Sequence, residues 1–152
     1  MLKPCIIGLG YVGLPILLNL SKKIKTIGFD INKKRILDLK NSRDTFNEFK
    51  KRDFAKKKIF FTNDVFKAKS ANFFIVAVPT PISKSKYPDL SHLKKVSENI
   101  SKILKKGDII FFESTVYPGV TNNLCKTILE KKSKLIEGKD FFIGYSPERV
   151  NP

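Results

Sequence analysis

Short apolar runs alternate with longer stretches of mixed polarity along the whole chain. The apolar runs predict six strands, at residues 3–7, 26–29, 59–61, 73–78, 108–113 and 141–145. The run at 73–78 contains no polar residue, which is typical of a strand in a parallel sheet that is covered on both faces. The alternation therefore predicts an α/β protein with a doubly wound parallel sheet, strand order 3-2-1-4-5-6 and helices on both faces.

The stretches between these strands have helical periodicity at residues 11–22, 32–39, 89–107 and 120–131. The apolar positions that support the first three helices are Val12, Ile16 and Leu20, then Ile36 and Leu39, then Leu93, Val96, Ile100 and Ile103. Gly107 is expected to end the third helix. Residues 41–58 are polar and irregular, and we expect Phe46, Phe49 and Phe54 to anchor this segment onto the body.

A glycine-rich turn follows the first predicted strand and opens the first predicted helix, in the order Gly8-Leu9-Gly10-Tyr11-Val12-Gly13. Gly8 permits the tight turn, Gly10 lets a pyrophosphate approach the backbone, and Gly13 lets the helix pack closely on the sheet. Asp30 ends the second predicted strand, 17 residues after Gly13, where a carboxylate accepts hydrogen bonds from ribose. The pattern predicts a Rossmann fold that binds NAD, and the charge of Asp30 disfavours NADP. The alternative is a tight turn in another kind of α/β protein.

Length and composition fit one domain, residues 1–152, because 41% of the chain is hydrophobic. No apolar run approaches the length of a membrane span, and the N-terminus enters a strand at once, so we expect a cytoplasmic protein without a membrane partner. The two cysteines make no disulfide framework, and Cys5 is expected to be a small buried hydrophobe. The only histidine, His92, has no second histidine or acidic cluster nearby. We therefore predict a surface residue there and no metal site.

The net charge of +16 is the one bulk property that suggests another class of function, because basic surfaces bind nucleic acids. All but four of the 30 basic residues are lysines, and they are spread over the chain. The densest stretch, residues 50–58, lies in the irregular segment. We interpret the lysines as solvated surface and expect no nucleic-acid partner. A basic surface also attracts anionic ligands such as a dinucleotide or a nucleotide sugar.

Three segments follow the predicted strands at the edge where the cofactor is expected, at residues 78–81, 113–116 and 145–149. Together with the glycine turn they make the chain resemble the NAD-binding domain of the UDP-glucose/GDP-mannose dehydrogenase family. The matching residues are Tyr11, Val12, Asp30, Pro79-Thr80-Pro81, Pro88-Asp89-Leu90-Ser91, Ser114-Thr115-Val116, Pro118-Gly119 and Ser146-Pro147-Glu148-Arg149-Val150. The end of the chain, from Glu148 to Pro152, is similar to the branch that oxidises UDP-N-acetylhexosamines.

The resemblance implies that C6 of a UDP-sugar is oxidised from alcohol to acid with two NAD, through a thioester on a cysteine, for the synthesis of surface polysaccharide precursors. It implies cofactor contacts from the backbone of Tyr11 and Val12 and from Asp30, Arg35, Pro79, Thr80, Ser114 and Thr115. Thr115 would also orient a water for which Glu148 is the acid/base, and Glu148, Arg149 and Val150 would contact the UDP-sugar. Two alternatives stay open: Ser114 and Thr115 cap the next helix, and Glu148 is a surface carboxylate.

Neither Cys5 nor Cys125 falls at the family's nucleophile position, so we expect a fragment that holds the cofactor domain without the catalytic centre. The intact family enzyme is expected to be a homo-oligomer. The sequence does not separate a gluco from a manno substrate. The alternative functions are a stand-alone dinucleotide-binding module and a smaller hydroxyacid dehydrogenase, and the latter gives no role to residues 146–150.

Overall fold

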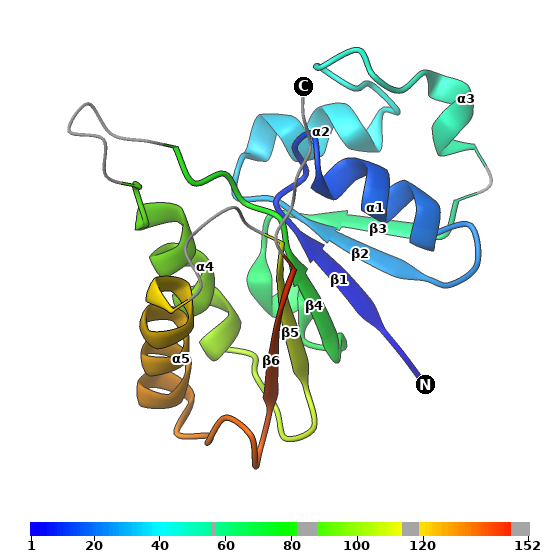
Figure 1. Ribbon diagram of the computed structural model, residues 1–152. Helices are drawn as coiled ribbons and strands as arrows, with labels where there is room; N and C mark the ends of the chain where they lie inside the picture. The colour runs from blue at the N-terminus through cyan, green and yellow to red at the C-terminus, as the bar shows by residue number, and fades with distance from the viewer. Residues whose placement is uncertain (56, 82–87, 114–118, 147–152) are drawn as a thin grey trace.

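A computed structural model describes residues 1–55, 57–81, 88–113 and 119–146, and within these the chain forms a six-stranded parallel sheet (Figure 1). The strands are β1 (Pro4–Ile7), β2 (Thr26–Phe29), β3 (Ile59–Thr62), β4 (Phe73–Val76), β5 (Ile109–Glu113) and β6 (Phe142–Ser146). Their order is β3-β2-β1-β4-β5-β6, which confirms the predicted topology. Cys5 of β1 pairs with Ile27 on one side and with Phe74 on the other. The order reverses between β1 and β4, and a cofactor binds at such a switch point.

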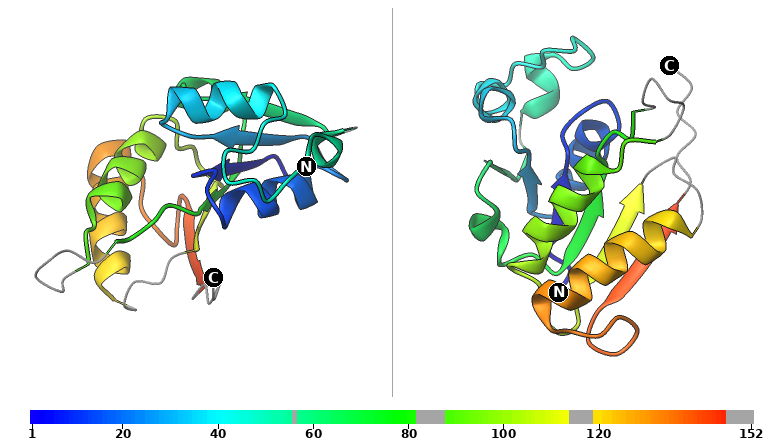
Figure 2. Two further views of the ribbon diagram at one scale, coloured as in Figure 1. Left: turned by 90° about the horizontal axis from the view of Figure 1, so that it is seen from above. Right: turned by 90° about the vertical axis from the view of Figure 1, so that its left-hand side faces the viewer.

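Helices cover the two faces of the sheet. They are α1 (Gly13–Leu20), α2 (Lys33–Lys40), α3 (Lys51–Phe54), α4 (Ser91–Ser101) and α5 (Val120–Ser133), with a 3₁₀ turn, η1 (Val65–Ala68). One core cluster joins α1 and α2 to the sheet through residues such as Leu17 and Ile75. A second, on the other face, joins α4 and α5 to β4, β5 and β6 through residues such as Leu93 and Phe112. Figure 2 shows α4 and α5 lying side by side on that face.

The face that α1 turns to the sheet differs from the predicted one. Its buried residues are Gly13, Leu14, Leu17 and Leu18, whereas Val12, Ile16 and Leu20 are half-buried. Because the helix is apolar around most of its circumference, periodicity alone leaves two faces open. The close approach of Gly13 to the sheet decides between them, since a Cβ there would clash with the carbonyl oxygen of Gly8.

Two further expectations were wrong in detail. Helix α4 ends at Ser101, well before Gly107, because turns in which Lys102 and Ile103 donate three residues back replace the helical bonds. Ile103 is nevertheless buried, as its periodicity predicted. The segment 41–58 is not wholly irregular, since α3 forms where the carboxylate of Asp53 accepts the backbone N–H of Lys50 at 2.7 Å. Phe49 and Phe54 pack on the α1–α2 core as predicted.

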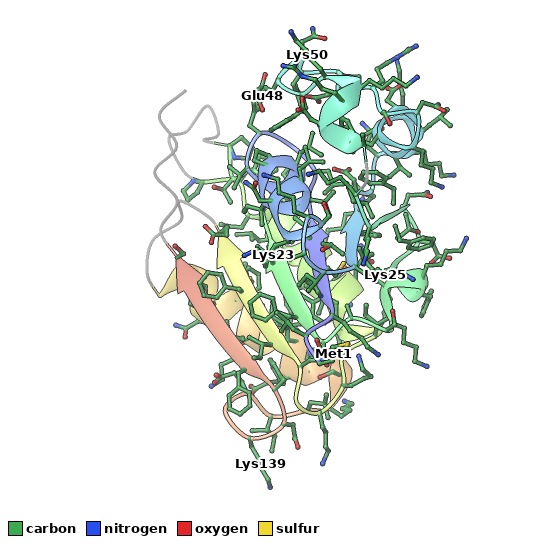
Figure 3. The ribbon with its side chains drawn as sticks, turned by 90° about the vertical axis from the view of Figure 1, so that its right-hand side faces the viewer. Met1, Lys23, Lys25, Glu48, Lys50 and Lys139 are labelled. Atoms are coloured by element: carbon green, nitrogen blue, oxygen red, sulfur yellow. The ribbon has the colours of Figure 1, made fainter. Side chains whose placement is uncertain are left out.

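Both cysteines are free and fully buried, as predicted for Cys5. The labelled lysines in Figure 3 lie far apart, with Lys50 at one end of the molecule, Lys139 at the other and Lys25 between them. In the part of the chain that the structure describes, no helix has the length and apolar character to cross a membrane.

Candidate functional site

A cleft of about 500 Å³ lies at the carboxyl ends of β1, β2 and β4, at the predicted switch point. Its floor is formed by residues 7–10 and 77–79. The other lining residues are on one wall 29–32, Lys34, Arg35, Asp38, Thr45 and Phe46, and on the opposite wall residues of α4. Five positions of the predicted cofactor site line this cleft: Gly8, Gly10, Asp30, Arg35 and Pro79. The backbone of the glycine turn and the side chains from β2 and α2 are thus brought together in space.

The three glycines of the turn have different surroundings. Gly8 has φ +88°, and a Cβ there would stand 2.6 Å from the carbonyl oxygen of Ala77. Gly13 is closed by the Gly8 carbonyl, so its lack of a side chain lets α1 sit against the turn. A Cβ on Gly10 would meet no protein atom within 4 Å, although Gly10 lines the cleft. Gly8 and Gly13 are therefore required by the fold, whereas the space beside Gly10 is available to a ligand.

The N-terminus of α1 supplies hydrogen-bond donors next to the turn. Leu14 donates its N–H to the carbonyl oxygen of Gly10 at 3.1 Å. The N–H groups of Tyr11 and Val12 donate to no acceptor among the residues that the structure describes. The first turn of the helix contains no acidic residue. Unused N–H groups and the positive end of the helix dipole favour an anion such as a pyrophosphate here, although the side chains of Tyr11 and Val12 do not line the cleft.

Asp30 fixes the turn as well as facing the cleft. One carboxylate oxygen accepts the N–H of Leu9 at 2.9 Å, and the other accepts the N–H of Asn32 at 2.9 Å. Each carboxylate oxygen has a second lone pair, so both can still accept from a ligand hydroxyl. Asp30 thus ties the glycine turn to the end of β2 and keeps acceptors for a ribose.

Arg35 is more deeply buried than a residue that merely flanks a ligand, with only 7% of its surface exposed. Its Nε donates to the carbonyl oxygen of Leu9 at 2.9 Å, and its Nη1 donates to Asp44 at 2.8 Å and to Thr45 at 2.9 Å. Its Nη2 is buried and has no partner among the described residues. The guanidinium also lies 4.6 Å from the ring centre of Phe46.

Phe46 anchors its loop onto the body, as predicted, but it does so through Tyr11 and Arg35 at the cleft and not in the core. It is 41% exposed and lines the cleft, with its ring centre 4.4 Å from that of Tyr11. The reason is local: Asp44 accepts the backbone N–H of Phe46 at 3.2 Å, and this turn directs the ring toward Arg35 and Tyr11. A cation and the ring of Phe46 therefore border this end of the cleft, and the ring of Tyr11 packs against Phe46.

The α4 wall was missed by the sequence reasoning. His92 is exposed, as predicted, but it also lines the cleft together with Lys95 and Asn99. Spacings of three and four residues place these positions on one side of a helix, and this spacing could have predicted from the sequence that they lie together. Among the described residues, no group of three or more His, Cys, Asp or Glu side chains is placed to hold a metal ion.

Other predicted site residues lie away from the cleft or outside the described residues. Thr80 is half-buried and does not line the cleft, although its neighbour Pro79 does. The predicted site residues outside the described ranges are Ser114, Thr115, Glu148, Arg149 and Val150.

The amino-acid sequence of the chain is similar to those of known proteins. Residues 2–152 match the model of the UDP-glucose/GDP-mannose dehydrogenase family, NAD binding domain. Protein CapL of Staphylococcus aureus is 50% identical over 97% of this chain and 35% of its own length. The UDP-N-acetyl-D-glucosamine 6-dehydrogenase of Salmonella typhi is 48% identical over 99% of this chain and 36% of its own length. The chain thus spans about a third of these relatives.

The fold agrees with the sequence match. A structure of UDP-D-ManNAc dehydrogenase from Pyrococcus horikoshii superposes with a TM-score of 0.90 at 30% identity, over 99% of this chain and 37% of that chain. A ternary complex of GDP-mannose dehydrogenase from Pseudomonas aeruginosa gives a TM-score of 0.90 at 26% identity, over 97% of this chain and 36% of that chain.

Proposed function

The chain belongs to the UDP-glucose/GDP-mannose dehydrogenase family and matches its NAD-binding domain, and we propose that it binds NAD in the cleft and is the cofactor domain of a nucleotide-sugar 6-dehydrogenase. The observation that carries the proposal is the meeting of the glycine turn, Asp30 and Arg35 around one cleft of about 500 Å³. The free space beside Gly10 fits a bound dinucleotide, and so does the Nη2 of Arg35, which has no partner in the part of the chain that the structure describes.

Each group has a task in holding the cofactor. The N–H groups of Tyr11 and Val12 would bind the pyrophosphate, and Asp30 would accept from the adenosine ribose while Arg35 donates to it. Bound NAD supplies the hydride acceptor, and the protein contributes position and charge. A titration by calorimetry tests this directly, since the chain should bind NAD and should bind NADP more weakly.

For the substrate, we propose a UDP-N-acetylhexosamine that is oxidised at C6 to the uronic acid. The support is the sequence from Glu148 to Pro152 and the similarity to the UDP-N-acetyl-D-glucosamine 6-dehydrogenase of Salmonella typhi, which is 48% identical. Glu148 would act as acid/base in hydrolysis of the covalent thioester, and Arg149 and Val150 would contact the UDP-sugar.

The role of Glu148 can be tested in the whole enzyme with Glu148→Gln. The amide keeps the size of the side chain but cannot take a proton from water, so turnover should fall on the order of 10²–10⁴-fold. Thioester hydrolysis should suffer more than hydride transfer, so an adduct between enzyme and substrate should accumulate and be visible by intact mass. Normal steady-state turnover in this variant would demote Glu148 to a surface carboxylate.

A further inference from the structure

Beside the cleft, a buried ion pair holds the guanidinium of Arg35 in place. The side chain of Asp44 has no exposed surface, and its Oδ1 lies 2.8 Å from Nη1 of Arg35. Thr45 accepts from the same Nη1 at 2.9 Å, and the carbonyl oxygen of Leu9 accepts from Nε. Two of the three guanidinium nitrogens are therefore used by the protein, and only Nη2 lacks a partner among the described residues.

The same carboxylate also shapes the loop that borders the cleft. Its Oδ1 accepts the N–H of Phe46 at 3.2 Å, and its Oδ2 accepts the N–H groups of Glu48 at 3.0 Å and Phe49 at 3.2 Å. Burial alone would raise the pKa of Asp44. Hydrogen bonds from Arg35, Phe46 and Phe49 outweigh that effect and hold the pKa below its usual range. Asp44 is thus a fixed negative charge that meets the cleft only through Arg35 and this loop.

We propose that Asp44 is a positioning residue for the adenosine half of the cofactor, because it fixes Arg35 so that Nη2 is left to donate to a ligand. This inference rests on the proposed function, since it assumes that a dinucleotide occupies the cleft. An unpartnered buried donor is unfavourable until an acceptor arrives, so a ribose hydroxyl would satisfy it. Asp44 lies nine residues beyond Arg35, and no motif marks the pair.

The test compares Asp44→Asn with Glu48→Gln. Glu48 belongs to the same loop and has an exposed side chain (Figure 3), so its substitution removes an equal charge without touching Arg35. We expect Asp44→Asn to raise the dissociation constants of both NAD and ADP-ribose by about tenfold or more. The factor should be the same for the two ligands, because the lost contact belongs to the adenosine half that they share. Glu48→Gln should bind both ligands as the parent does.

A thermodynamic cycle separates positioning from a general structural effect. If Asp44 acts through Arg35, the double variant Arg35→Lys/Asp44→Asn should bind NAD no more weakly than Arg35→Lys alone. Losses that simply add would overturn the proposal. So would an Asp44→Asn protein that binds NAD within twofold of the parent.

A second variant keeps the test decisive if Asp44→Asn does not fold. Thr45→Val removes the other acceptor of Nη1 and leaves the Asp44 bonds intact, so it should weaken NAD and ADP-ribose in parallel but less strongly. In that case, unchanged affinity in a folded Thr45→Val protein would overturn the inference. If the parent protein does not bind NAD, the proposed function is wrong. If the parent binds NAD and the variants bind it equally well, the proposed function stands and only the role of Asp44 is wrong.

Discussion

At the scale of single residues, Asp30 carries two duties that a substitution can separate. Asp30→Ala should weaken NAD by about 10–100-fold, because hydrogen bonds to a charged acceptor are lost. It should also reduce the difference in affinity between NAD and NADP, since no carboxylate then repels the 2′-phosphate. Calorimetric titration with both cofactors measures the two effects.

The matched control is Asp30→Asn, which keeps an acceptor for the N–H of Leu9 but removes the charge. It should keep the turn and still narrow the NAD–NADP gap. Equal affinity of the parent for NAD and NADP would contradict the assignment of Asp30.

Asp44 gives the stability of the protein a defined pH dependence. Its pKa is lowered in the folded state, so its contribution is present above the unfolded pKa of about 3.9 and is lost as pH falls through the folded value. At pH 7, Asp44→Asn should cost about 3–5 kcal/mol, because Arg35 stays buried without its counter-charge. Below the unfolded pKa of about 3.9, Asp44 takes up a proton in the unfolded parent while it is still charged in the folded parent, so the difference between the two proteins should shrink as the pH falls further.

Urea unfolding of the parent and of Asp44→Asn from pH 7 down to pH 3 measures this difference. Asp89 and Asp140 also have pKa values below the usual range, through hydrogen bonds from the N–H groups of Ser91 and Ile136 respectively. They remain in both proteins and cancel in the comparison. A stability gap that stays constant through the acid range would show that the charge of Asp44 is not what stabilises the fold.

At the scale of elements, the glycines of the turn between β1 and α1 have two different roles. Gly8 and Gly13 are required by the fold, whereas Gly10 leaves space for the ligand. Gly13→Ala should lower the melting temperature strongly and abolish NAD binding, because its Cβ would collide with the Gly8 carbonyl. Gly10→Ala should leave stability within about 0.5 kcal/mol, as for surface substitutions away from packed features, and still lose most of the affinity for NAD. Thermal unfolding and NAD titration of both variants check this. A Gly10→Ala protein that binds NAD normally would show that the pyrophosphate does not pass beside Gly10.

The order and type of the strands could be predicted from sequence because each is a continuous apolar run next to a turn signal. The run at β4 contains no polar residue, and the glycine turn fixes where β1 ends. The boundaries of α4 and the buried face of α1 could not be predicted in this way. The end of α4 is set by turns in which Lys102 and Ile103 donate three residues back, and the buried face of α1 by the close approach of Gly13 to the Gly8 carbonyl, and local periodicity contains neither.

The site was predictable where a motif encodes a backbone shape and not where it depends on distant side chains. Gly8, Gly10 and Asp30 belong to such a motif and line the cleft. Asp44 and Phe46 belong to a polar segment without periodicity. Their part in the site follows only from their contacts in the folded structure, those of Asp44 with Arg35 and of Phe46 with Tyr11. Roles implied by family resemblance for Ser114, Thr115 and Glu148 stay predictions, because these residues lie outside the described ranges.

At the scale of the whole molecule, the cleft and the buried thiols together predict a protein that binds a dinucleotide without oxidising a sugar to the acid. Both cysteines are fully buried, and burial raises the pKa of each thiol. A raised pKa and a closed surface leave little thiolate for attack on an aldehyde. The chain of 152 residues should therefore form no uronic acid from UDP-N-acetylglucosamine or UDP-N-acetylmannosamine, although it binds NAD.

Three measurements on the same preparation test this prediction. NAD at about 100 times its dissociation constant should stabilise the fold by about 2.7 kcal/mol, which appears as a higher melting temperature. A thiol reagent should react slowly with the native protein and rapidly with both cysteines in denaturant, and NAD should slow the native reaction further, because ligand binding suppresses the opening that exposes a buried thiol. Formation of the uronic acid from either UDP-sugar would contradict the prediction, because the step from aldehyde to acid through a thioester requires a thiolate that neither buried cysteine supplies.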